Sequence, residues 1–149
     1  MGLLDIFKRK RKIRDELFGE MGYTKFSDSL KDFYDGEVTF DSQNMGISVD
    51  ADEHGPTKEQ KEFYLKIRDN YPTIKKDIII PFLNKELEQW QENKVIDFDK
   101  EFTLDGISIS RITDKPVEWS MTLYSLKIHH YVTIEFVDLT PQEGVAVDG

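Results

Sequence analysis

Residues 118–149 constrain the fold most, because they read as three consecutive β-strands. Apolar and polar side chains alternate over 118–124, which is the two-residue period of a strand with one buried face. The alternation returns over 129–139, and a shorter apolar–polar run follows over 144–149. Turn-forming residues separate the last two runs. Three strands joined by short links predict an antiparallel meander.

Further strands are expected on both sides of the middle of the chain. The stretches 37–41 and 46–50 each place two apolar side chains on one face, and a link of hairpin length joins them. The stretches 98–104 and 106–110 predict two more strands with a turn at an Asp-Gly pair. The stretch 23–34 fits either a helical stripe or an extended segment.

The clearest helical signal covers residues 57–92, where large apolar side chains recur every three or four positions. Thr57 and Gln60 have the spacing of a capping box at its start. Pro72 and Pro81 interrupt the stretch, and each removes a backbone donor and clashes one turn back. We expect either one kinked helix or two helices, and we favour two antiparallel helices that separate near Pro72.

The amino-terminal segment concentrates the basic residues of the chain. Apolar residues among the first 18 positions predict an amphipathic helix over residues 1–18. Two readings stay open, namely weak membrane-surface contact by residues 3–14 and a solvated helix face docked on an acidic body. The basic patch consists of Lys8, Arg9, Lys10, Arg11, Lys12 and Arg14.

The order of these segments predicts an α+β fold in one domain, residues 1–149. Strands and helices occur in separate runs, which is typical of an antiparallel sheet with helices to one side. We expect about five to seven strands with two to three helices packed on one face.

Charge sets the kind of partner. The net charge is −9 and residues 1–17 contribute +3, so residues 18–149 carry −9 − 3 = −12. An acidic body repels nucleic-acid phosphate and attracts cationic proteins, so we expect a basic protein partner and no nucleic acid on the acidic body, whereas the basic segment could serve as a membrane-surface or nucleic-acid anchor. The chain has no cysteine, no apolar run of membrane-spanning length and no signal-peptide pattern at its start. These features predict a cytoplasmic protein.

Catalytic motifs are absent from the sequence. It contains no nucleophile elbow, no phosphate-binding glycine loop and no recognisable metal motif, so we expect no metal and no cofactor. His129 and His130 are neighbours and would point to opposite faces of a strand. A small hydrolase or ligand-binding enzyme that uses carboxylates with one of these histidines stays an alternative.

Large aromatic residues are the remaining candidates for a contact surface. If the tyrosines lie on the sheet face away from the helices, beside acidic groups, they would suit a cationic protein surface. The predicted binding residues are Trp119, Tyr124, Tyr131, Glu135, His129 and His130.

The last 32 residues, 118–149, also carry a resemblance. Trp119-Ser120, the His130-Tyr131 pair leading to Glu135-Phe136, and the closing run 144–149 resemble small uncharacterised bacterial proteins, some encoded near polymorphic toxins. The resemblance implies an α+β cytoplasmic domain with immunity-protein-like binding, and it assigns no functional residue. The leading hypothesis is a non-enzymatic protein-binding domain, with the enzyme and the peripheral membrane protein as alternatives.

Overall fold

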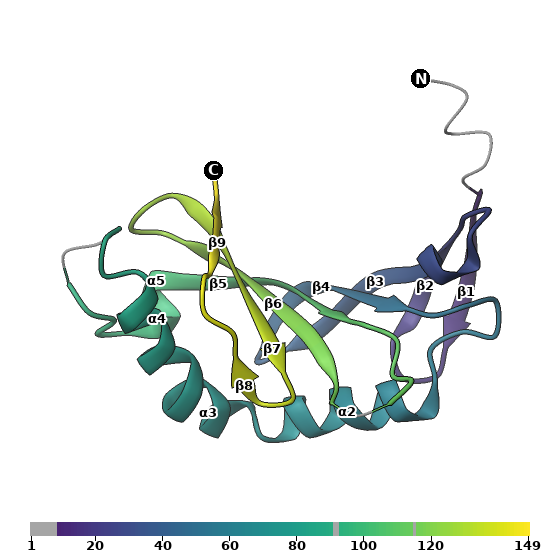
Figure 1. Ribbon diagram of the computed structural model, residues 1–149, viewed down its shortest axis with the longest axis horizontal. Coiled ribbons are helices and arrows are strands. Elements are labelled where there is room, and N and C mark those ends of the chain that lie inside the picture. Colours follow the sequence, from purple (N-terminus) through teal and green to yellow (C-terminus); the bar gives the residue numbers. More distant parts are fainter. Residues whose placement is uncertain (1–8, 91–92, 115) are drawn as a thin grey trace.

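The computed structural model describes residues 9–90, 93–114 and 116–149, and its centre is one nine-stranded sheet (Figure 1). The sheet order is β1-β2-β3-β4-β5-β6-β7-β8, and β9 pairs with β7. The strands are β1 (Arg9–Asp15), β2 (Gly19–Lys25), β3 (Phe33–Phe40), β4 (Gln43–Asp50), β5 (Phe102–Ile109), β6 (Glu118–Ser125), β7 (His130–Val137), β8 (Thr140–Pro141) and β9 (Ala146–Asp148).

The sheet consists of two antiparallel meanders joined in the middle. Strands β1 to β4 pair with their sequence neighbours, as do β5 to β7, while β8 and β9 both pair with β7. The joint is the parallel pair of β4 and β5, and the helical segments connect these two strands. The α+β class and the mostly antiparallel sheet are confirmed. The strand number exceeds the predicted five to seven, since β1, β2 and β8 were not expected.

The helical block begins where its capping box predicts. Thr57 Oγ1 accepts from the Gln60 amide and Gln60 Oε1 accepts from the Thr57 amide. The helical segments are α2 (Lys58–Asp69), α3 (Tyr71–Ile74), the π-helical turn η2 (Lys75–Ile79), α4 (Ile80–Glu86) and α5 (Phe98–Glu101), and a 3-10 turn, η1 (Ser29–Lys31), precedes β3.

The predicted break near Pro72 is confirmed, because α2 ends at Asp69 and Asn70 is its C-cap. The antiparallel arrangement is wrong: Figure 1 shows α2 and the α3–α4 segment following one another at an angle. The π-helical turn lies just before Pro81 and shifts the hydrogen bonding to a longer spacing. Proline has no backbone N–H to donate, and the longer hydrogen-bond spacing lets the helix continue without that donor. The chain therefore stays helical and does not reverse direction at Pro81.

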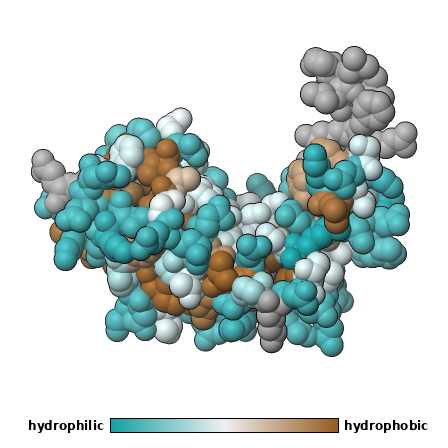
Figure 2. Space-filling model, viewed as in Figure 1, coloured by the Kyte–Doolittle hydropathy of each residue, from teal (hydrophilic) through white to brown (hydrophobic). Residues whose placement is uncertain are grey.

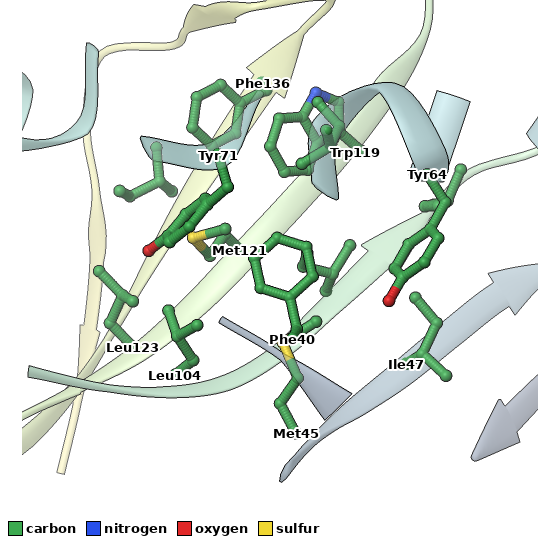
Figure 3. Packing of buried hydrophobic residues seen from close by; sticks show 14 of the residues in the cluster. Phe40, Met45, Ile47, Tyr64, Tyr71, Leu104, Trp119, Met121, Leu123 and Phe136 are labelled. Carbon is green, nitrogen blue, oxygen red and sulfur yellow. The ribbon is translucent and has the colours of Figure 1, made fainter. Parts of the chain in front are cut away.

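The core lies on one face of the sheet, which we call the apolar face (Figure 3). Two ring contacts join residues of this face to helical residues: Phe40 on β3 meets Tyr71 of α3 with centroids 4.9 Å apart, and Trp119 on β6 meets Phe63 of α2 at 5.7 Å. The strand residues of this face include Met21, Tyr34, Met45, Ile47, Val49, Leu104, Ile107, Ile109, Met121, Leu123, Val132, Ile134 and Phe136.

The predicted amino-terminal helix is wrong over Arg9–Asp15, which is the edge strand β1. Asp15 Oδ2 accepts from the amides of Leu17 and Phe18, at 2.8 and 2.9 Å, and Gly19 follows with a φ of +74°. These features make a tight hairpin, and pairing with β2 outweighs a weak helical pattern. The predicted segment before Arg9 lies outside the described residues.

Two further strand predictions need correction. The stretches 98–104 and 106–110 are not two strands, because α5 covers the start and β5 runs through the Asp-Gly pair with a bulge between Leu104 and Gly106. The extra residue of the bulge is Asp105, which interrupts the pairing without reversing the chain. The link between β3 and β4 is also shorter than expected. Asp41 and Ser42 alone form it, with φ of 50° and 63°, as in a two-residue hairpin turn.

Candidate functional site

The face of the sheet opposite the core, which we call the polar face, carries short polar side chains in cross-strand rows. In one row, Asp35 on β3 pairs with Ser48, which is followed by Ser108, Ser120 and finally Glu135 on β7. Each serine is half-buried between fully buried apolar neighbours on its strand. Between β3 and β7 the row therefore runs from one carboxylate to another with three hydroxyls between them, and beyond Asp35 it continues through Gly22 on β2 to Lys12 on β1.

The adjacent row repeats this arrangement with smaller residues. Glu37 pairs with Gly46, which is followed by Gly106, Thr122 and Thr133. The Oγ1 atoms of the two threonines are 3.0 Å apart. Gly46 and Gly106 have no side chains, so the backbone is uncovered in the middle of the row. A Cβ at Gly106 would lie only 3.1 Å from the Gly46 carbonyl oxygen, which is a tight contact.

The two rows form the floor of a hollow. A cavity of about 300 Å³ lies over Gly46, Ser48, Ser108, Ser120 and Thr122. Figure 2 shows the surface dipping between two raised ends, with residues of neutral hydropathy in the dip. We call this hollow the trough. Asp35 is among its lining residues, whereas Glu37 and Glu135 stand farther out in the same rows, and we call Asp35 and Glu37 the β3 wall and Glu135 the β7 wall.

The charged residues of strands β3 to β9 all have one sign. Across β3 to β9, all of whose residues the structure describes, neither lysine nor arginine occurs. The same strands contain seven carboxylates, namely Asp35, Glu37, Asp50, Asp105, Glu118, Glu135 and Asp148. Burial raises the pKa of Asp50, although nearby Arg111 opposes the shift. The field over this part of the sheet therefore attracts cations.

Two predicted binding residues lie together at one end of the trough. Tyr124 on β6 and Tyr131 on β7 are cross-strand partners, and their rings meet edge to face with centroids 5.0 Å apart. Tyr131 is 42% exposed and pairs on its other side with Asp148 of β9. Glu135 shares the polar face with this pair. The structure thus brings together three of the six predicted residues.

Trp119 lies in the core and not on a surface. Its ring stacks on Phe136 with centroids 4.2 Å apart, and its Nε1 donates to the carbonyl oxygen of Asp138 at 2.6 Å. Alternation along β6 puts Trp119 on the apolar face, opposite Tyr124. A partner on the polar face cannot touch this indole.

The histidines lie at the turn between β6 and β7, apart from the trough. His129 has a φ of +57° and an exposed side chain, so it is not in a strand as expected. His130 begins β7, and its Nδ1 lies 2.7 Å from the Ile128 carbonyl oxygen. Within the described ranges, no three His, Asp or Glu side chains are grouped closely enough to hold a metal ion.

The basic patch lies on the edge strand β1, where Arg11 and Lys12 line a cavity of about 580 Å³ together with Asp35 and Glu37 of β3. The Arg11 guanidinium lies 5.0 Å from the Tyr23 ring centroid, and Lys12 Nζ lies 3.5 Å from Glu20. Arg14 is exposed, Arg9 and Lys10 are part of the β1 backbone, and Lys8 precedes the described residues. In the part of the chain that the structure describes, no helix has the length and apolar character to cross a membrane.

A second groove runs along α2. It has a volume of about 670 Å³, with Phe63, Val117 and Leu139 among its apolar lining residues and Glu59 and Glu62 among its charged ones. Figure 2 shows hydrophobic surface between hydrophilic residues over the lower half of the molecule, where α2 and β8 lie in Figure 1. Lys66 and Asp138 are also among its lining residues, so this second groove is a surface of mixed charge against which the trough can be tested.

The serine and glycine rows were missed by sequence reasoning. The absence of lysine and arginine from the strand segments was a readable signal, but the rows depend on the pairing of β4 with β5. No protein-family description matches the chain, and neither a curated protein nor a solved structure matches it.

Proposed function

We propose that this protein is a non-enzymatic protein-binding domain whose polar face receives a cationic protein partner. The proposal takes the helices to cover the apolar face and leave the polar face free. One observation carries it: seven carboxylates and no lysine or arginine lie on strands β3 to β9. A single-sign surface of this kind steers an oppositely charged partner and makes its association rate depend on salt.

The aromatic pair supports the same reading. Tyrosine is enriched at the centres of interfaces, where an apolar ring and a hydroxyl both find contacts. Tyr131 is exposed beside Asp148, so a lysine or arginine could contact its ring and a carboxylate together. The resemblance of residues 118–149 to toxin-locus proteins adds a biological setting, in which the partner is a basic toxin domain and the function is immunity.

The test is capture of proteins from the native cell with charge-reversed variants. Glu37→Lys with Glu135→Lys reverses one charge on each wall, and both side chains are exposed, so folding should be preserved. Glu59→Lys with Glu62→Lys makes the same change of charge at the second groove. We expect the wild type and the α2 variant to capture the same basic protein at low salt and the wall variant to lose it.

Two results would contradict the proposal. If no protein is recovered at low salt, the protein-binding function fails. If the α2 variant loses the partner and the wall variant keeps it, then binding occurs at the second groove and the polar face is not the site.

A further inference from the structure

We infer that the trough is shaped to hold one α-helix of the partner, with small residues against its floor and lysine or arginine on both flanks. This inference rests on the proposed function and names the kind of segment that the polar face receives.

The width of the trough fits a helix. Four strand spacings separate Asp35 from Glu135 along their row, which gives about 19 Å between backbones. An α-helix with its side chains is about 10–12 Å across. The remaining few ångströms on each side match the reach of the wall carboxylates toward cationic side chains on the helix flanks. An extended segment is only one strand spacing wide, so it would meet one wall and leave the other unpaired.

The floor allows the close approach that a helix needs. Gly46 and Gly106 bring bare backbone to the surface, and Ser48, Ser108 and Ser120 rise only one heavy atom beyond their Cβ. A helix with alanine, glycine or serine on its lower side could therefore lie deep enough for its flanks to reach both walls. The backbone of β4, β5 and β6 is paired on both sides, so a partner strand has no edge to join there.

The strands beneath the trough set the length of the helix. The cavity itself covers the middle of β4, β5 and β6, but each of these strands has eight residues, which corresponds to about 26 Å. A helix rises 1.5 Å per residue, so about 18 residues cover the full length of these strands. At one end the helix would pass Tyr124 and Tyr131, whose rings offer an apolar contact to the stem of a lysine or arginine.

The test uses two synthetic peptides of about 18 residues with equal charge. One is an alanine–lysine peptide whose lysines lie on two flanks of a helix, and the other has prolines that prevent a helix. Binding to the full chain is measured by fluorescence anisotropy at low salt, and helicity by circular dichroism. Ser108→Trp fills the floor without changing charge, and Thr73→Trp adds the same aromatic ring at an exposed position of α3, away from the trough.

We expect the helical peptide to bind at least about tenfold more tightly than the proline peptide and to gain helicity on binding. Ser108→Trp should weaken binding of the helical peptide about tenfold, whereas Thr73→Trp should leave its affinity within about twofold of the wild-type value. Equal binding of both peptides, or no effect of Ser108→Trp, would overturn the helix inference.

The charge variants separate that failure from failure of the proposed function. If Glu37→Lys with Glu135→Lys abolishes binding of both peptides equally, the polar face binds cations without selecting a helix, and only the inference falls. If that variant binds both peptides as the wild type does, the polar face is not the cation-binding surface, and the proposed function falls with the inference.

Discussion

Gln60 is the residue whose substitution gives the sharpest test of how the two halves of the sheet are joined. Its side chain is fully buried at the start of α2. Oε1 accepts from the Thr57 amide at 2.9 Å, and Nε2 donates to the carbonyl oxygens of Asp50 and Ser110, at 2.8 and 3.0 Å. Asp50 is the last residue of β4 and Ser110 follows β5, so one side-chain amide links both strands of the parallel pair to the helix.

Replacement of Gln60 by leucine keeps the approximate volume and removes all three hydrogen bonds. Each lost bond costs about 1 kcal/mol, and the two carbonyls left without a donor bring the total to about 3–4 kcal/mol. Burial of the leucine methyls offsets about 1–2 kcal/mol. We expect a net loss of about 2 kcal/mol in the free energy of unfolding, or about 4–8 °C in Tm.

The assay is urea unfolding followed by tryptophan fluorescence, because Trp119 is buried in the core. The matched control is Gln142→Leu, since Gln142 is exposed and its Nε2 makes one bond, to the Thr140 carbonyl oxygen. This control should stay within about 0.5 kcal/mol of the wild type. Equal stability of Gln60→Leu and the wild type would refute the reasoning that Gln60 joins the two meanders.

A second substitution adds a pH dependence with a defined sign. Gln60→Glu places a carboxylate oxygen against the same two carbonyls, so the charged form is disfavoured in the fold and the carboxyl pKa rises above its unfolded value. The loss of stability caused by the buried charge is then present at neutral pH, and it shrinks as the pH falls toward the pKa of this carboxyl in the unfolded chain. Stability relative to the wild type should therefore improve on acidification.

Three more expectations follow from the contacts. Burial alone would raise the pKa of Asp15, but hydrogen bonds from Lys61 and two backbone amides lower this pKa in the folded protein. The charged carboxylate therefore stabilises the fold above the unfolded-state pKa, and this stabilisation is lost as the pH falls through the folded-state pKa. Asp15→Asn should accordingly flatten the acid limb of a curve of stability against pH. Trp119→Ala should lose about 3–5 kcal/mol of stability in urea unfolding. Tyr131→Ala should instead keep the wild-type Tm and weaken partner binding. A fall in Tm for Tyr131→Ala as large as that for Trp119→Ala would contradict the placement of Tyr131 on the surface. Deletion of residues 1–14 removes most of β1 and exposes β2, so it should lower the Tm, and an unchanged Tm would show that β1 is dispensable.

Local signals predicted much of the fold. The capping box of Thr57 and Gln60 and the meander over residues 118–149 depend on neighbouring residues, and both appear where expected. The identity of β1 could not be predicted, because lysine and arginine suit either structure and pairing with β2 decides. The bulge at Asp105 was mistaken for a turn because an Asp-Gly pair is common in both.

In the candidate site, too, local sequence patterns predict some features, whereas others depend on long-range strand pairing. Alternation along β6 and β7 places Tyr124, Tyr131 and Glu135 on one face and Trp119 on the other, so the burial of Trp119 was readable from the sequence. The serine row was not, because it needs β4 beside β5 in parallel, and 51 residues separate them (Gln43–Asp50 from Phe102–Ile109). Such long-range pairing leaves no local pattern.

The most direct test of the central claim is site-specific photo-crosslinking in the native cell. A photoreactive residue replaces Ser120, in the floor of the trough, or Glu62, beside the second groove. Mass spectrometry then identifies the attached peptide. The account predicts a crosslink from Ser120 to a lysine- and arginine-rich protein segment and none to that protein from Glu62. Crosslinks from Glu62 alone, or none to any protein from Ser120, would contradict the claim that the polar face binds a cationic partner.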